Sequence, residues 1–242
     1  MYNIVGDNML LDYLKIVIIV SLIPVIMISL YISSKVDSDK PFAFIFHLFL
    51  KGILSCIPAC ILEMIFSYYY PNAPKDLTNL FIYTFFSVGI IEEFCKWINV
   101  VKASDDYTID RIYDLVIYAV TVSLGFAFFE NITYTLRFGI TTEIIRDFLS
   151  VPGHAMFGAF MGYYLGMAKY HQGERHYIRF IIYGIFSLLM PALFHTTFDF
   201  ILSVESNYVT IIFFIFLIIA YRIIIHKINS MASNNRRIRK RY

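Results

Sequence analysis

Long apolar stretches recur along this chain, and they constrain its fold more than any other feature. A helix needs about 20 apolar residues, at about 1.5 Å per residue, to cross a bilayer core about 30 Å thick. Seven stretches of roughly this length are separated by short polar connectors, at 13–32, 42–68, 79–101, 112–136, 152–170, 178–202 and 207–226. We therefore expect an all-α polytopic membrane protein, a bundle of about seven transmembrane helices that forms a single domain over residues 1–242.

The composition excludes the other broad classes of protein. Apolar residues make up 59% of the chain and charged residues 16%, whereas soluble domains contain about 45–50% and about 25%. A soluble chain of this length could not hide so much apolar surface. The cysteines Cys56, Cys60 and Cys95 lie in apolar stretches and give neither a disulfide framework nor zinc-ligand spacing. A net charge of +2 gives no reason to expect a nucleic-acid partner, so the lipid bilayer is the expected surrounding.

The distribution of basic residues predicts the orientation of the spans. Cytoplasmic loops of membrane proteins carry an excess of Lys and Arg. With the N-terminus outside, most Lys and Arg residues fall in cytoplasmic loops, and the outside loops hold only Lys75, Arg137 and Arg146. We therefore expect an N-terminus outside and a C-terminus in the cytoplasm, with residues 227–242 as a basic cytoplasmic tail.

Ionisable residues inside the predicted spans are the candidate functional residues, because a charge near the bilayer centre costs about 2.5–3.5 kcal/mol on insertion scales. Lys51 and Glu63 of the second span lie within reach of its ends, where a structural interpretation is sufficient. The informative residues lie in the third to sixth spans: Glu92, Glu93, Lys96, Glu130 with its neighbour Asn131, His154, His195 and Asp199.

The spacing of these residues predicts which of them share a helix face. Residues four apart lie on one face, and three pairs have this spacing: Glu92 with Lys96, Phe126 with Glu130, and His195 with Asp199. An ion bridge between Glu92 and Lys96 accounts for that pair structurally but leaves Glu93 unexplained. Since neighbouring residues on a helix diverge by about 100°, the two glutamates cannot face one point equally. Asp199 can orient and charge the His195 ring.

A row of small residues follows His154 at the start of the fifth span. Gly158, Gly162 and Gly166 are spaced by four and allow a neighbouring helix to approach closely. This packing would bring His154 near the carboxylates. With the predicted orientation, the group of polar residues opens toward the extracytoplasmic side.

Several carboxylates and two histidines, without a Ser or Cys nucleophile in a recognisable setting, favour the activation of water. A glutamate takes a proton from a water molecule that attacks a peptide carbonyl, and a histidine stabilises the oxyanion or protonates the leaving amine. Cys95 is disfavoured as a nucleophile because it faces away from Glu92. The sequence thus favours peptide hydrolysis within the membrane.

Four short motifs resemble those of the PrsW family of bacterial intramembrane proteases, which is related to the CAAX prenyl protease and bacteriocin-processing group. The patterns EExxK, FxxxE and HxxxD occur in order, at 92–96, 126–130 and 195–199, together with Val-Pro-Gly-His at 151–154. Each motif alone is weak, but four in order within apolar stretches form a specific pattern.

The resemblance implies an intramembrane endopeptidase of the bacterial cell membrane. It implies a first cut, near the extracytoplasmic side, in a single-span anti-sigma factor. A second intramembrane protease would then act on the same substrate and activate the sigma factor in a stress response. The catalytic residues expected from the resemblance are Glu92, Glu93, Glu130, His154, His195 and Asp199, supported by Lys96, Phe126 and Asn131.

The mechanism expected at this stage is glutamate-dependent. Glu92 or Glu93 acts as the base, Glu130 and His154 hold the water, and His195, oriented by Asp199, stabilises the oxyanion. No cofactor is required by these motifs, and the sequence lacks HExxH, but a divalent metal is compatible with them. Its expected ligands are Glu92, Glu130, His154 and His195.

Two other classes of function stay open. A proton- or ion-coupled transporter also places acids and histidines inside a helix bundle, although such proteins tend to show matching halves and this chain does not. A non-catalytic membrane immunity or scaffold protein would tolerate loss of the glutamate pair as long as packing survived.

Overall fold

Apart from short gaps, the computed structural model covers the chain with helices. It describes residues 2–35, 40–105, 109–204, 207–233 and 237–238. The elements in chain order are α1 (Tyr2–Ser33), α2 (Phe42–Tyr69), α3 (Leu77–Thr84), the π-helical turn η1 (Phe85–Gly89), α4 (Ile90–Ala103), α5 (Ile112–Phe138), α6 (Ile140–Gly173), α7 (Tyr177–Ser203) and α8 (Asn207–Ser233). The predicted all-α architecture is confirmed.

Within the described residues, six helical segments are long and apolar enough to cross a membrane. They are Leu11–Ser33, Phe42–Tyr69, Leu77–Ala103, Ile112–Phe138, Tyr177–Ser203 and Ile211–Ser230. The remaining predicted span, 152–170, is also helical, but it forms part of the longer and less apolar α6. Many large apolar side chains of α1, α2, α7 and α8 are exposed, which suits contact with lipid chains.

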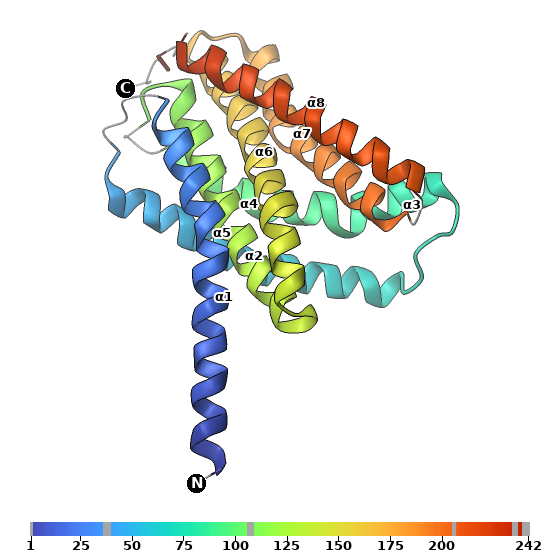
Figure 1. Cartoon of the computed structure of the whole chain (residues 1–242). Helices are drawn as coiled ribbons and strands as arrows, with labels where there is room; N and C mark the ends of the chain where they lie inside the picture. The colour runs from blue at the N-terminus through green and yellow to red at the C-terminus, as the bar shows by residue number, and fades with distance from the viewer. Residues whose placement is uncertain (1, 36–39, 106–108, 205–206, 234–236, 239–242) are drawn as a thin grey trace.

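Helix α5 occupies the centre of the bundle. Of its 27 residues, 18 are buried, and it packs against α1, α2, α4, α6 and α8. Helix α6 lies between α5 and α7, and α8 covers α6 and α7. The N-terminal half of α1 extends beyond the rest of the bundle (Figure 1). The core is therefore built around α5 and α6, which carry half of the predicted motifs.

Glycines allow close packing of helices around α5, as the sequence predicted for α6. A Cβ atom on Gly162 would lie 2.5 Å from Cα of Val116, and one on Gly158 would lie 2.7 Å from the Ser123 hydroxyl oxygen. A Cβ atom on Gly52 of α2 would lie 3.0 Å from Cα of Gly125. Such contacts hold helix backbones closer together than larger residues permit.

The start of α6 differs from the prediction. The segment between the fourth and fifth predicted spans, 137–151, was expected to be an outside loop. Instead the chain turns at Gly139, whose φ of 89° favours glycine, and α6 begins at the next residue. Residues 140–151 therefore run back along the end of α5 as a helix, and Arg146 becomes part of the bundle.

A second difference lies in the third predicted span. It consists of α3 and α4 joined by η1, a five-residue π-helical turn that ends directly before the turn carrying Glu92 and Glu93. Gly89 of this turn lies against α7, because a Cβ atom there would lie 3.0 Å from the Ala192 carbonyl oxygen. Single π turns within α-helices are frequent at functional sites.

The C-terminal segment returns to the beginning of α5. Helix α8 continues through Ser233, past the predicted end of the last span at 226. Arg237 forms an isolated β-bridge with Arg111, and the Ile238 N–H donates to the Asp110 carbonyl at 2.8 Å. The remaining tail residues lie outside the described part of the chain.

Candidate active site

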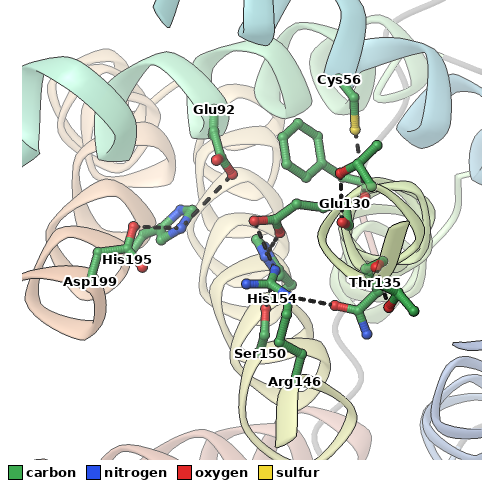
Figure 2. Close-up of polar contacts among 12 residues, drawn as sticks. Cys56, Glu92, Glu130, Thr135, Arg146, Ser150, His154, His195 and Asp199 are labelled. Carbon is green, nitrogen blue, oxygen red and sulfur yellow. Dashed lines mark hydrogen bonds and ion pairs between the residues drawn. The ribbon is translucent and has the colours of Figure 1, made fainter. Parts of the chain in front are cut away.

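A cavity of about 560 Å³ lies where several helices meet. Its lining includes polar residues from five helices: Glu63 of α2, Glu92 of α4, Glu130 of α5, Arg146 and His154 of α6, and His195 and Asp199 of α7. The carboxylate of Glu92 points between His195 and Asp199 on one side and Glu130 and His154 on the other (Figure 2). Residues that are far apart in the sequence thus surround one space.

Lys96 lies at the centre of the polar cluster and is fully buried. Its ammonium nitrogen lies 2.7 Å from Glu93 Oε1, 3.2 Å from Glu92 Oε2 and 3.1 Å from His154 Nδ1. The same nitrogen lies 3.9 Å from the centre of the Phe126 ring. The i,i+3 and i,i+4 spacings let one cation contact two adjacent carboxylates, which offsets part of the cost of burying them.

The two adjacent glutamates have different surroundings. Glu92 lines the cavity, whereas Glu93 is fully enclosed, and its Oε2 atom has no hydrogen-bond partner among the described residues. Glu93 Oε1 is shared by Lys96 and His195. The predicted divergence of neighbouring side chains is therefore confirmed. Glu92 can meet a substrate or water molecule, and Glu93 holds other side chains in place.

His195 is fixed by contacts on both ring nitrogens. Its Nδ1 lies 3.0 Å from Glu93 Oε1, and its Nε2 lies 3.3 Å from Asp199 Oδ2 and 3.8 Å from Glu92 Oε2. The ring stacks on Phe157, with centroids 4.8 Å apart. Glu93 therefore orients the ring so that Nε2 is directed at Glu92 and Asp199.

His154 is held between a cation and a carboxylate. Its Nδ1 faces Lys96 at 3.1 Å, and its Nε2 lies 2.8 Å from Glu130 Oε2. Since an ammonium group can only donate, Nδ1 accepts from Lys96 and the Nε2–H donates to Glu130. The expectation that the glycine row brings His154 near the carboxylates is confirmed.

Every predicted site residue belongs to this cluster or to its direct support. Phe126 lies under Lys96, and Asn131 accepts a hydrogen bond from Arg146 at 2.9 Å. Cys95 lies apart, in an apolar cluster with Cys56, Ala59 and Phe126. His195 and Asp199 of the sixth span thus meet Glu92 of the third at a common cavity.

Two charged residues of the cavity lining were not among the predicted site residues. Glu63 was explained by its position near a span end, but it lines the cavity. Arg146 was placed in a loop, but it forms an ion pair with Glu130 at 2.8 Å. The available signal for Glu63 was its spacing from Cys56 and Ala59, which are buried on the same face of α2. Arg146 gave no comparable signal, because its partners lie on another helix.

The donor set fits a divalent metal. Glu92, His154 and His195 each offer a ligand atom, and these atoms lie within 4.8 Å of one another. Two histidines and one glutamate form the protein ligands of many catalytic zinc sites, where a fourth position stays open. The cavity provides that position, and the Glu93 contact to His195 Nδ1 is the usual second support of a metal-binding histidine.

Glu130, the fourth predicted ligand, is not part of this triad among the described residues. Its two carboxylate oxygens are engaged by Arg146 and His154 instead. The carboxylates Glu92, Glu93, Glu130 and Asp199 outnumber the cations Lys96 and Arg146 in the cluster. This excess of negative charge favours an additional cation.

Comparisons with known proteins agree with this geometry. Residues 40–224 match the model of a family described as PrsW family intramembrane metalloprotease. A protein named Protease PrsW from Oceanobacillus iheyensis is 30% identical over 214 residues, which cover 87% of this chain and 94% of the relative. Proteins of the same name from Geobacillus kaustophilus and Bacillus subtilis are 32% and 31% identical, each over 74% of this chain and over 75% and 78% of their own lengths. No solved structure matches the chain.

Proposed function

This chain belongs to the PrsW family of intramembrane metalloproteases, and we propose that its substrate is a single-span anti-sigma factor. The family makes it a protease, and its helices make it a multi-pass protein of the bacterial cell membrane. In the proposed reaction it cuts the substrate near the extracytoplasmic side, and a second intramembrane protease then acts on the product. The N-terminus lies outside in this arrangement, and residues 227–242 form a cytoplasmic tail.

The observation that supports peptide hydrolysis at this site is the convergence of Glu92, His154 and His195, from three helices, on one cavity. Glu92 acts as the general base. Its carboxylate lines the cavity and lies 3.2 Å from the buried Lys96 ammonium, which keeps it in place. It accepts a proton from a water molecule while the water oxygen attacks the peptide carbonyl carbon.

His195 stabilises the negative charge that develops on the carbonyl oxygen. Glu93 holds its Nδ1 at 3.0 Å, and Asp199 lies 3.3 Å from its Nε2. When Nε2 carries a proton, its N–H donates to the oxyanion. Glu130 and His154 form the opposite wall and hold the attacking water against Glu92. The proton taken by Glu92 passes to the leaving amine nitrogen as the C–N bond breaks.

A divalent metal would be held by Glu92, His154 and His195, and it would polarise the water and the substrate carbonyl. His154 would exchange its Nδ1 contact with Lys96 for the metal, because its Nε2–H donates to Glu130. The carboxylate of Glu92 has two oxygens, so one can contact a metal while the other accepts a proton. His195 would bind the metal through the Nε2 lone pair in place of the Nε2 proton, and the metal would then meet the oxyanion; Nδ1 retains its contact with Glu93 in either case.

The test uses purified full-length protein in liposomes with an anti-sigma factor that carries a different tag at each end. We expect a single cut near the extracytoplasmic face, located by mass spectrometry, and loss of cleavage in Glu92→Gln. A chelator should abolish cleavage, and Zn²⁺ should restore it, when the metal is required. Cleavage that persists in chelator would leave the glutamate alone as the activating group.

The alternatives predict other results in the same liposomes. Equal cleavage of an unrelated single-span protein would contradict the anti-sigma factor as the specific substrate. Proton-coupled uptake that depends on Glu92, without any cleavage, would favour a transporter. A non-catalytic scaffold would retain its cellular function in Glu92→Gln.

A further inference from the structure

Arg146 is brought to the site by the turn that begins α6. The chain reverses at Gly139, and the first turns of α6 run back along the end of α5. This path places Arg146 opposite two consecutive residues of α5, Glu130 and Asn131. The mechanism above uses Glu130 but gives no role to Arg146.

Two of the three nitrogens of the Arg146 guanidinium contact protein groups. Its Nη2 lies 2.8 Å from Glu130 Oε1 and 3.0 Å from the Ser150 hydroxyl, and its Nε donates to Asn131 Oδ1 at 2.9 Å. Its face covers the Tyr134 ring at 3.9 Å. An arginine with these contacts is fixed in position, so it is poorly suited to bind a substrate carboxylate. Figure 2 shows it beside Glu130, on the side away from Glu92.

Asn131 fixes the direction of the arginine. Its side chain is fully buried, its Oδ1 accepts from Arg146, and its amide nitrogen donates to Asp147 Oδ1 at 2.8 Å. The Asn131 amide therefore accepts from one residue and donates to the next residue in the same turn of α6. This contact accounts for Asn131 next to Glu130 within an apolar span.

Glu130 connects Arg146 to His154. One carboxylate oxygen faces Arg146 at 2.8 Å, and the other lies 2.8 Å from His154 Nε2. Without Arg146 the carboxylate loses the contact that sets its rotation, and His154 then loses a fixed acceptor. His154 contributes one of the three converging ligand atoms at the cavity.

We propose that Arg146 is a positioning residue that acts through Glu130 to hold His154 in its working orientation. A planar guanidinium suits this task because it offers several N–H donors in a fixed geometry, whereas a lysine supplies a point charge. The inference rests on the proposed function for its cleavage assay, and on the geometry of Arg146, Glu130 and His154 for its other measurements.

The experiment compares Arg146→Gln and Arg146→Lys with a matched control, Arg137→Gln. Arg137 is exposed, and its guanidinium lies over the Phe138 ring. We expect Arg146→Gln to lower kcat about 10- to 100-fold, the usual effect of removing such a supporting contact, with little change in KM. Arg146→Lys should recover part of the loss, Arg146→Ala should be rescued by added guanidinium ion, and Arg137→Gln should match the wild type.

A double-mutant cycle tests the route of the effect. If Arg146 acts through Glu130, the double variant Arg146→Gln/Glu130→Gln should be no slower than Glu130→Gln alone. The NMR signals of the labelled His154 ring should shift in Arg146→Gln, and this readout does not depend on cleavage. A rise in KM at constant kcat, additive effects in the cycle, or an unchanged His154 ring would each overturn the proposal. An inactive wild type with a shifted His154 ring in Arg146→Gln would instead contradict the proposed substrate.

Discussion

Two carboxylates with charged partners lie toward opposite ends of α5, Asp114 buried and Glu130 half-buried, and their surroundings differ. Asp114, in the first turn, accepts hydrogen bonds from the backbone N–H groups of Asp110 and Arg111 at 2.9 and 3.0 Å, and lies 3.0 Å from the Lys40 ammonium. Glu130, near the other end, also has charged partners, but its side chain is 18% exposed and lines the cavity. Asp114 caps the start of α5, and Glu130 lines the candidate active site.

The difference shows that burial of a charge does not by itself identify a functional residue. The oxygen of Asp114 that makes these contacts is used to cap its own helix and to pair with Lys40. At the other end, Glu92, His195 and Asp199 direct polar atoms into a space large enough for a peptide and water. A charge inside a span marks an energetic cost, whereas a charge that also lines a cavity marks a candidate for chemistry.

Glu92→Gln should have the largest effect, and the effect should fall on catalysis. The change removes the proposed base, and general-base catalysis contributes about 10²- to 10⁴-fold. We expect kcat to fall about 10³-fold in the liposome assay, with no loss of thermal stability, because Lys96 keeps Glu93 at 2.7 Å. If Glu92→Gln is unstable but retains its kcat per folded molecule, Glu92 has a structural role and is not the base.

Asp114→Ala should have the opposite pattern. It removes a shared acceptor from two backbone N–H groups and a buried partner of Lys40, and breaking such buried pairs costs about 3–5 kcal/mol. We expect the free energy of unfolding in detergent to fall by about 3 kcal/mol, with kcat per folded molecule unchanged. Asp12→Ala is the surface control. Asp12 pairs with Lys15 at 2.9 Å in an exposed position, so its loss should leave the free energy of unfolding nearly unchanged.

Gly162→Ala tests the segment of α5 between these two ends. An added methyl group would lie 2.5 Å from Cα of Val116, so α6 must move away from α5, and overpacking of this kind costs about 1–3 kcal/mol. Since α6 carries His154, we expect a smaller fall in kcat along with the loss of stability. Gly184→Ala is the matched control, because nothing lies within 4 Å of a Cβ atom there. A loss of stability without any change in kcat would mean that the site tolerates movement of α6.

The sequence was sufficient to predict the helices and most of the polar cluster, because both depend on local patterns. Apolar length predicts a span, and the spacing of Glu92 with Lys96 or of His195 with Asp199 predicts a shared face. The start of α6 could not be predicted in this way. Arg146 reads as a loop residue by hydropathy, and it is accommodated within a helix because Glu130 and Asn131 of α5 meet its charge.

Two further features depend on packing between distant segments. The π-helical turn before Glu92 lies against α7 at Ala192, and neither segment alone indicates it. Glu63 lines the cavity because α2 packs against α4, α5 and η1, which also border it, although its position near a span end has an ordinary explanation. Sequence patterns report which face of a helix is apolar, but they do not report which helix lies opposite.

Asp76→Ala should have the smallest effect on stability. Comparing it with Asp114→Ala shows how much burial adds to the contribution of a capping carboxylate. Asp76 caps α3 from the N-cap position, whereas Asp114 reaches back to the N-cap from within the first turn of α5. Asp76 Oδ1 accepts from the Asn79 N–H at 2.9 Å, and its Oδ2 accepts from the Asn79 amide at 2.8 Å. These hydrogen bonds lower the pKa of Asp76 below its usual value of 3.8. A carboxyl whose pKa is lower in the folded state stabilises the fold above the unfolded pKa, and this contribution is lost as the pH falls through the folded pKa.

The difference in melting temperature between the wild type and Asp76→Ala should therefore be small at neutral pH and should shrink further below about pH 4. Thermal melts at pH 7 and at pH 3 in the same detergent measure it, and a difference that grows toward low pH would contradict the assignment. Asp76 is exposed, so solvent screens its charge. When it is removed, water can hydrogen-bond to the Asn79 N–H groups that it accepted from. The capping contacts of Asp114 are enclosed and accompany a buried ion pair with Lys40, and the larger effect expected there comes from this enclosure and this pair.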